Sequence, residues 1–158
     1  MKNIFIIAFL LISLSSSALA GLSKIDGVVT DDVSALEWQD DYSDNSGNVK
    51  VSNWIDAISY CENLSLNLHT DWRLPNRNEL LSIANFSTYN YAISGVFENL
   101  GAISVDAYGA NTAYYWTSTT DLVDDLIWVV NFYDGLSAIS LSKDSPSPYV
   151  RCVRAGNQ

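Results

Sequence analysis

The sequence predicts an α+β domain, because two segments with helical periodicity lie between segments with the alternation typical of β-strands. The predicted order is a β-hairpin at residues 28–40, two helices, a long irregular region at residues 85–113 and a β-meander at residues 115–154. We expect the two helices to pack on a small antiparallel sheet, with the irregular region as a long loop and one disulfide as the main covalent tie.

The composition bounds the size of the protein and the class of its partners. The chain has 158 residues, of which 8 are Lys or Arg and 18 are Asp or Glu, for a formal net charge of -10. This length suits one domain. Nucleic acids and anionic membranes are bound through clustered basic residues, so the acidic balance argues against both as partners. The aromatic fraction of 12% predicts a folded chain rather than a disordered acidic tail.

Residues 1–20 are typical of a secretory signal peptide. Lys2 precedes an apolar run over residues 4–14, and Ala18 and Ala20 place small residues where signal peptidase cleaves. A membrane anchor is the alternative, but the run is shorter than the roughly 20 residues that a span needs. Cleavage near Ala20 would leave residues 21–158 as a single domain without a membrane span. We therefore expect a protein that is secreted, periplasmic or at the cell surface.

Export would place both cysteines, Cys61 and Cys152, in an oxidising compartment where disulfides persist. Two cysteines allow only one pairing, which would close a long loop. A free reactive thiol or a metal pair is the alternative. Neither cysteine has another Cys or a His at ligand spacing, which favours the disulfide.

The predicted hairpin rests on a turn-like stretch at residues 31–34, followed by Leu36 and Trp38 in alternation with polar residues. The polar residues 40–50 predict a loop.

The first predicted helix begins after Ser52 or Asn53, either of which can cap it. Trp54, Ile58 and Cys61 then recur at the spacing of one helical face, so that face should be buried. Because Cys61 lies on it, the disulfide would tie this helix into the core.

The second predicted helix follows Pro75, which keeps the preceding residue out of helical angles. Asn76 is the expected cap, and Glu79 stands at the capping-box spacing. The apolar face of this helix comprises Leu80, Leu81, Ile83 and Ala84.

The C-terminal part predicts strands at residues 115–119, 127–133, 136–141 and 149–154. Asp134-Gly135 is a strong signal for a two-residue hairpin turn. In the last strand, alternation places Val150 and Cys152 on one face.

Four short segments occur in order along the chain: YCENL (60–64), WRLP (72–75), YWTS (115–118) and RCVR (151–154). Together they resemble the Lcl C-terminal domain, the terminal module of bacterial collagen-like adhesins, which is also found alone in secreted proteins. The resemblance covers nearly all of residues 26–154. The residues assigned to fold motifs are Trp54, Trp72, Arg73, Leu74, Pro75, Glu79, Trp116, Arg151 and Arg154.

The resemblance implies a fold similar to C-type-lectin-like domains and to formylglycine-generating enzymes, which share a WRLP-type segment. In C-type-lectin-like domains a first-helix cysteine pairs with one in the final strand, and Cys61 and Cys152 occupy equivalent places. The calcium-binding Glu-Pro-Asn, Gln-Pro-Asp and Trp-Asn-Asp segments of sugar-binding C-type lectins are absent. Lcl-type adhesins are associated with sulfated polysaccharides, a ligand class that calls for a basic surface and does not suit this acidic chain.

The long irregular region carries the residues expected to bind a ligand, because loops carry function more often than scaffolds do. Tyrosine offers rigid contact area with a polar tip. The candidates are Tyr89, Tyr91, Tyr108, Asn111 and Tyr114. The tryptophans could stack on sugar rings, but their places on apolar stripes and in the motifs assign them to the core.

The arginines Arg73, Arg77, Arg151 and Arg154 could bind a carboxylate or a sulfate through paired hydrogen bonds. Their places near or within the motif segments favour structural pairing with acidic residues.

Asp121, Asp124 and Asp125 cluster in a predicted turn, where calcium could bind. A solvated acidic loop is the favoured interpretation, so no cofactor is predicted and a need for calcium is left open. His69 is the only histidine, and no motif of a Ser-His-Asp or Cys-His centre surrounds it. The sequence also lacks a phosphate loop, a dinucleotide fingerprint and zinc-ligand spacing.

The leading hypothesis is an exported, non-catalytic binding module that recognises a glycan or another surface ligand in adhesion. The alternative is a structural or assembly subunit that binds a protein partner outside the cytoplasm, which could be a second copy of itself. A third hypothesis is an enzyme similar to the formylglycine generators, which would require a free thiol.

Overall fold

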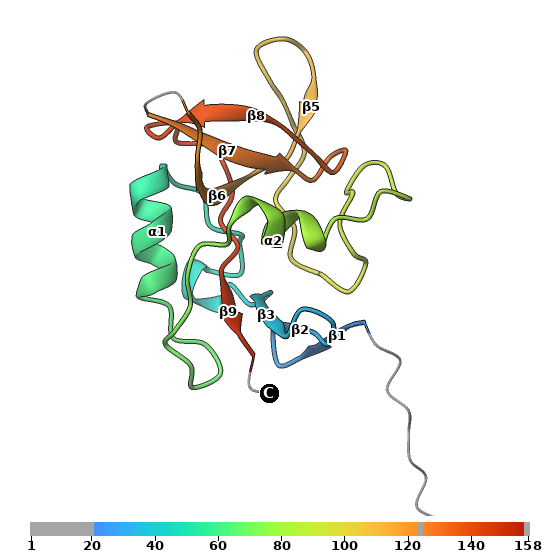
Figure 1. Cartoon of the computed structure of the whole chain (residues 1–158), viewed down its shortest axis with the longest axis vertical. Helices are drawn as coiled ribbons and strands as arrows, with labels where there is room; N and C mark the ends of the chain where they lie inside the picture. Colours follow the sequence, from blue (N-terminus) through green and yellow to red (C-terminus); the bar gives the residue numbers. More distant parts are fainter. Residues whose placement is uncertain (1–20, 123–124, 157–158) are drawn as a thin grey trace, which may run out of the picture.

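The computed structural model describes residues 21–122 and 125–156 (Figure 1). The predicted signal peptide at residues 1–20 lies outside the described residues. The elements in chain order are β1 (Leu22–Ile25), β2 (Val28–Asp31), β3 (Leu36–Gln39), a 3-10 turn η1 (Ser43–Asn45), α1 (Trp54–Glu62), α2 (Arg77–Ser82), β4 (Ser104–Val105), β5 (Asn111–Thr112), β6 (Tyr114–Thr120), β7 (Leu126–Asn131), β8 (Leu136–Ser142) and β9 (Val153–Ala155).

The fold is α+β, with two α-helices and antiparallel sheets in the described residues, as predicted. The expectation of one small sheet is wrong, because the strands form a four-stranded sheet β1-β2-β3-β9, a three-stranded sheet β6-β7-β8 and the short pair β4-β5. Figure 1 shows the four-stranded sheet at one end of the molecule and the three-stranded sheet at the other. A C-type-lectin-like architecture stays a prediction.

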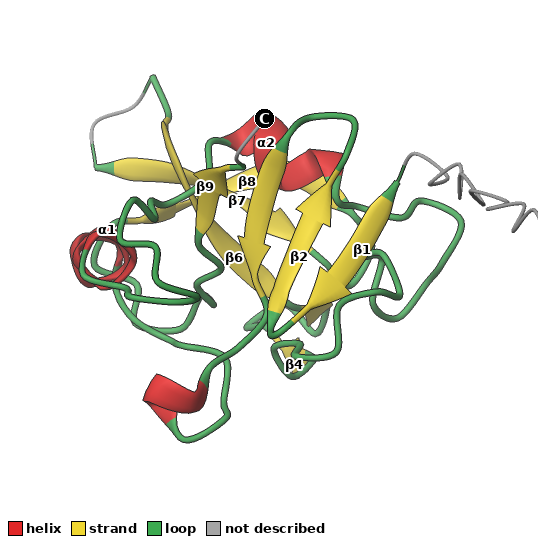
Figure 2. Ribbon diagram, turned by 90° about the horizontal axis from the view of Figure 1, so that it is seen from below, coloured by secondary structure: helices red, strands yellow, loops and turns green. Residues whose placement is uncertain are grey.

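The four-stranded sheet joins the two ends of the described chain, because β9 pairs with β3. The predicted hairpin of β2 and β3 is confirmed, whereas β1 was not predicted. β1 joins β2 through Asp26 and Gly27, whose positive φ angles of 48° and 76° suit a two-residue turn between the paired Ile25 and Val28. Figure 2 shows β1 at the side of the molecule opposite α1.

Both helices begin at the predicted caps. The Asn53 side chain accepts a hydrogen bond from the backbone N–H of Asp56, and α1 buries Ala57 and Cys61 completely. In α2 the capping box is complete, since Asn76 and Glu79 each accept a hydrogen bond from the other's backbone N–H. Local side-chain chemistry therefore sets where each helix starts.

Residues 85–113 are not merely a long loop, which corrects the prediction. They contain β4 and β5, and they bury Ala92, Ile93 and Phe97 in the interior. These apolar residues follow neither a helical nor a strand period, because each reaches the core from irregular backbone. The region is therefore part of the packed body of the domain.

The turn between β7 and β8 is longer than predicted. Asn131 pairs with Leu136, so four residues rather than two connect the strands. The Asn131 side chain accepts hydrogen bonds from the backbone N–H groups of Ala113 (2.7 Å) and Tyr133 (3.1 Å). Gly135 closes the turn with φ +79° and donates to the Asn131 carbonyl. These contacts of Asn131 favour the wider turn over the two-residue one.

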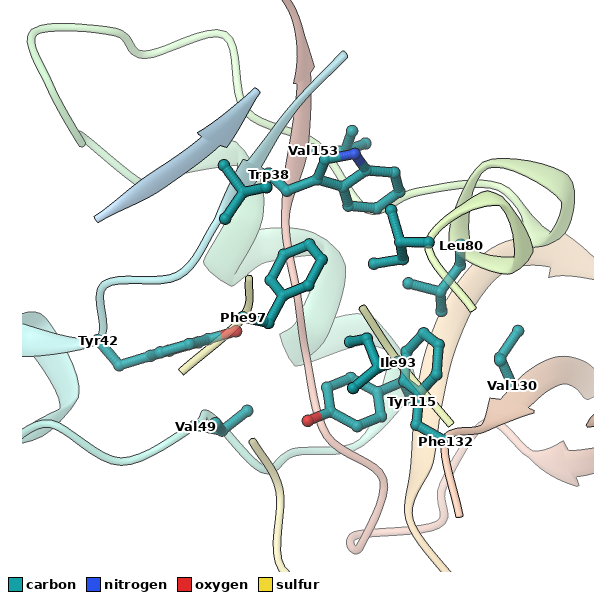
Figure 3. Packing of buried hydrophobic residues seen from close by; sticks show 12 residues of the cluster. Trp38, Tyr42, Val49, Leu80, Ile93, Phe97, Tyr115, Val130, Phe132 and Val153 are labelled. Atoms are coloured by element: carbon teal, nitrogen blue, oxygen red, sulfur yellow. The ribbon is translucent and has the colours of Figure 1, made fainter. Parts of the chain in front are cut away.

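Two clusters of buried apolar residues form the core. The first, shown in Figure 3, comprises Val29, Trp38, Tyr42, Val49, Leu80, Ile83, Ile93, Phe97, Tyr115, Val130, Phe132 and Val153. The second comprises Val28, Ala57, Cys61, Leu64, Trp72, Leu74, Trp116, Ile127, Val129, Val150 and Cys152. The three-stranded sheet contributes to both, because alternate residues of β7 point to opposite faces.

The predicted disulfide between Cys61 and Cys152 is confirmed, with both residues completely buried in the second cluster. It joins α1 to the segment that leads into β9. That segment was predicted as a strand over residues 149–154, but only Val153–Ala155 pairs as β9. The expected alternation nevertheless holds, since Val150 and Cys152 lie in the second cluster and Val153 lies in the first.

Candidate functional site

Two of the candidate arginines, the exposed Arg73 and the buried Arg154, hold the fold through ion pairs. Arg73 binds Glu79 through two hydrogen bonds of 2.8 and 2.6 Å. Arg154 donates to Glu37 (2.5 Å) and to Asp71 (2.7 Å), so it connects β3 and β9 to the segment before WRLP. These carboxylates neutralise the charges of both arginines, which agrees with the prediction that the arginines pair with acidic residues of the fold.

The other two arginines are also used internally. Arg151 is completely buried and pairs with Asp40. Arg77 donates to Ser137 through its Nε (2.6 Å), and its guanidinium lies 4.2 Å from the centre of the Trp128 ring. Neither presents a free bidentate face to a ligand.

The motif tryptophans support the fold instead of exposing their rings. Trp72 and Trp116 are at most 2% exposed, and Trp116 donates to the carbonyl of Ser52. The half-buried Trp54 donates to the carbonyl of Thr117. Leu74 and Pro75 of the WRLP segment are buried as well, and Leu74 lies in the second cluster with Trp72 and Trp116.

The acidic cluster near β7 is engaged in protein contacts. Asp121 accepts a hydrogen bond from Ser140 (2.7 Å), and Lys143 forms an ion pair with Asp125 (2.5 Å). Asp124 lies outside the described residues. Within residues 21–122 and 125–156, no three His, Cys, Asp or Glu side chains are grouped in a way that could hold a metal ion. The charge of Asp125 is balanced by the ammonium group of Lys143.

The groups considered for nucleophilic catalysis were the two cysteines and His69. Both thiols are consumed by the Cys61–Cys152 disulfide. His69 lies in a tight turn, where its backbone pairs with that of Leu66.

Aromatic side chains that are exposed or half-buried lie around the turn between β7 and β8. Phe86 and Tyr89 are each 69% exposed, on a loop that Figure 1 shows beside this turn. The Tyr89 and Tyr133 rings meet edge to face, with centroids 4.9 Å apart. Phe86 covers Gly135, where an added Cβ would lie 3.1 Å from the Phe86 ring. We call this surface the tyrosine patch and define it as Phe86, Tyr89, Asn111, Tyr114 and Tyr133.

The loop that carries Tyr89 is pinned at its base. Ala92 donates to the carbonyl of Phe132 (2.7 Å), and Asn85 donates to the carbonyl of Ala92 (3.2 Å). The side chain of Asn85 also accepts hydrogen bonds from Ser87. Tyr89 is therefore held next to the end of β7 by the backbone on either side of it.

Asn111, from β5, completes the contact set. Its side-chain amide donates to the Tyr133 hydroxyl at 3.1 Å. The backbone nearby is fixed as well. The N–H of Ala113 donates to the Asn131 side chain, and the carbonyl of Ala113 accepts a hydrogen bond from the N–H of Phe132. Tyr133 thus connects Tyr89 and Asn111, which lie in separate parts of the irregular region.

The pKa values of the tyrosines in the patch depend on hydrogen bonds between them and on two nearby carboxylates. Interaction with the Tyr133 hydroxyl raises the pKa of Tyr89, while hydrogen bonding by Tyr89 and Asn111 lowers the pKa of Tyr133. Burial raises the pKa of Tyr114, and the negative charges of Asp106 and Asp134 raise it further. Both carboxylates therefore lie close enough to Tyr114 to act on it electrostatically.

The remaining two candidate tyrosines are placed differently. Tyr91 packs against the first core cluster and is only half-exposed. Tyr108 is 94% exposed at the turn between β4 and β5. Neither shares a hydrogen bond or ring contact with Tyr133 in the described residues.

The sequence reasoning missed Tyr133, Phe86 and the carboxylates of Asp106 and Asp134. Tyr133 was assigned to a strand, although its place just before Asp134-Gly135 at a turn was a signal of exposure. Asn111 and Tyr89 were selected, but no feature of the sequence showed that both contact Tyr133.

A family model described as the Lcl C-terminal domain matches residues 27–154. No curated protein matches the chain. In the described part of the chain, no helix has the length and apolar character needed to cross a membrane.

Proposed function

The chain belongs to the Lcl C-terminal domain family, and on that premise we propose that it is an exported, non-catalytic module that binds a glycan at the tyrosine patch. The observation that carries the proposal is the pair of the exposed Tyr89 and the half-buried Tyr133, with rings 4.9 Å apart and Asn111 bonded to the Tyr133 hydroxyl. The family membership accords with a non-enzymatic module and leaves the ligand to be identified.

The chemistry of the patch suits a sugar. A sugar ring presents C–H groups on its face and hydroxyls at its edge, so it can stack on an aromatic ring and hydrogen-bond beside it. Tyr89 and Tyr133 provide ring faces with hydroxyl tips, and Asn111 provides an amide that can donate and accept. Sites of this kind combine apolar area with a few placed polar groups.

The patch is also pre-organised. The loop of Tyr89 is pinned to the end of β7, and Asn131 fixes the backbone of both Ala113 and Tyr133. Little ordering entropy is then lost when a ligand binds, which favours affinity from a small contact area.

A binding assay on a glycan array tests the proposal. Tyr133→Ala removes the residue that connects Tyr89 and Asn111, so we expect a loss of affinity of about tenfold or more, typical of a central aromatic contact. Tyr108→Ala is the matched control, because Tyr108 is 94% exposed and lies outside the patch. Equal thermal midpoints of the two variants would show that both are folded.

Two results would overturn the proposal. One is an absence of binding above background for the unmodified protein on an array of neutral, acidic and amino glycans. The other is binding by Tyr133→Ala at the strength of the unmodified protein.

A second function is favoured by the apolar members of this region. Phe86 and Leu136 are 69% and 56% exposed and carry no polar group, and aromatic area of this kind is typical of protein interfaces. The chain would then be an assembly subunit that binds a protein partner. A strict monomer in light scattering, with no partner recovered by crosslinking in cells, would reject this function.

A further inference from the structure

We propose that the glycan bound at the tyrosine patch carries free amino groups, and that Asp106 and Asp134 bind them. The inference rests on the proposed function and adds the chemical class of the ligand. It predicts selection against sulfated or carboxylated glycans.

Each carboxylate is fixed in place and keeps one oxygen for a ligand. Asp134 accepts the backbone N–H of Leu136 on Oδ1 at 2.9 Å. Asp106 accepts the N–H groups of Tyr108 and Ala110 on Oδ1, both at 2.9 Å. Among the described residues, neither Oδ2 accepts a hydrogen bond. Asp134 directly follows Tyr133, and Asp106 is bonded to Ala110, the residue before Asn111, so the two carboxylates border the same patch.

The positive charges of the domain are held elsewhere. Of the seven Lys and Arg side chains in the described residues, five are in ion pairs: Lys24, Arg73, Lys143, Arg151 and Arg154. Arg77 is bonded to Ser137 and stacked on Trp128. Lys50 lies over the Tyr60 ring. Within the described chain, none of these groups hydrogen-bonds to the patch or stacks on it.

This arrangement of charges should favour a cationic ligand over an anionic one. An anionic glycan would bring its sulfates or carboxylates next to Asp106 and Asp134 without a cation to offset the repulsion. A protonated amine can instead form a charge-assisted hydrogen bond with a carboxylate and contact the face of a tyrosine ring. The charge of the patch thus favours an amino sugar.

A basic peptide would meet the same two carboxylates, but it would use less of the site. The hydroxyls of Tyr89 and Tyr133 and the amide of Asn111 are uncharged groups beside the aromatic faces. They match the hydroxyls of a sugar, whereas a Lys-rich segment offers them no partner beyond its backbone. The combination of neutral polar groups with two carboxylates therefore favours the glycan.

Calorimetric titration of the purified protein with matched oligosaccharides tests the inference. The probes are a glucosamine hexamer, an N-acetylglucosamine hexamer, a heparin hexasaccharide and an oligolysine, at about pH 5.5, where amines are protonated and Asp is ionised. We expect the glucosamine hexamer to bind about tenfold or more tightly than its acetylated counterpart, and heparin not to bind.

The variant Asp106→Asn with Asp134→Asn keeps the Oδ1 acceptors of both turns and removes both charges. We expect it to bind the two hexamers equally, because only the charge-dependent preference is lost. Asp32→Asn is the control, since Asp32 is exposed on the four-stranded sheet's β2–β3 turn, away from the patch.

Each other outcome has a distinct meaning. Equal binding of the two hexamers, or binding of heparin, overturns the inference and leaves glycan binding intact. Tighter binding of oligolysine than of glucosamine overturns the inference in favour of a basic peptide. A preference for glucosamine that survives in the double Asn variant also overturns it. If no sugar binds while the protein is folded, the proposed function fails as well.

Discussion

Arg151 and Asp40 form an ion pair inside the protein, with Nη1 and Oδ1 2.9 Å apart and both side chains completely buried. Arg151 also donates to the carbonyl of Gln39 at 2.6 Å. Asp40 accepts the backbone N–H groups of Glu98 and Asn99, so the pair ties β3 to the irregular region and to the segment before β9. The Arg151 guanidinium lies 4.4 Å from the centre of the Phe97 ring, in the core.

Removing the negative charge from this pair should destabilise the fold strongly. In Asp40→Asn the buried guanidinium of Arg151 loses its counter-ion, and we expect a loss of about 3–5 kcal/mol in the free energy of unfolding. Urea denaturation followed by tryptophan fluorescence measures it. Glu98→Gln is the control, because the Glu98 side chain is 75% exposed and its pair with Lys24 should contribute about 1 kcal/mol or less. A loss in Asp40→Asn no larger than in the control would contradict the prediction.

Removing the disulfide should lower stability through the unfolded state. The bond joins residues 91 positions apart, so its loss releases a long closed loop, and we expect a cost of about 2–5 kcal/mol. Denaturation with and without reductant measures the difference. An alkylating reagent should modify Cys61 and Cys152 only after reduction, and modification of the native protein without reductant would refute the pairing.

The cap of α2 should contribute measurably by itself. Asn76→Ala removes the acceptor for the Glu79 N–H, and we expect a loss of about 1 kcal/mol. Asn78→Ala is the matched control, since Asn78 is exposed within the helix and alanine is the better helix former. Thermal unfolding of both variants provides the comparison. An equal effect of the two substitutions would show that capping is not the cause.

Stability should fall at alkaline pH because of Tyr42. Burial raises its pKa far above the usual value of 10.0, so the folded state keeps a proton that the unfolded chain releases. Stability is then fully present below about pH 10 and is lost as the pH rises further. In Tyr42→Phe the urea midpoint should fall less steeply above that pH than in Tyr108→Phe, an exposed control. Parallel pH profiles of the two variants would contradict this assignment.

Local signals predicted several elements correctly. The caps at Asn53 and Asn76 act through side chains within three residues, and the alternation of β7 depends only on the pleat of a strand. The irregular region was underestimated because Ile93 and Phe97 are buried by neighbours that are distant in sequence. The β7–β8 turn was predicted too short, since its length depends on the Asn131 side chain reaching Ala113.

Only some residues of the candidate site were predicted from the sequence. Tyr89 and Asn111 were selected from composition, whereas Tyr133, which contacts both, was assigned to a strand. The two carboxylates proposed to bind the ligand come from two different turns, which only the folded chain brings together through the contact of Asn111 with Tyr133.

The sequence by itself determined the α+β class, the helix starts and the cysteine pairing, because these depend on neighbouring residues or on the only pairing that two cysteines allow. The tertiary structure alone decided that Arg151 is buried against Asp40 and that Tyr89 meets Tyr133 at the surface. Each of these pairs joins positions far apart in the chain. Their contact depends on how the sheets and the irregular region pack, which no local pattern of residues encodes.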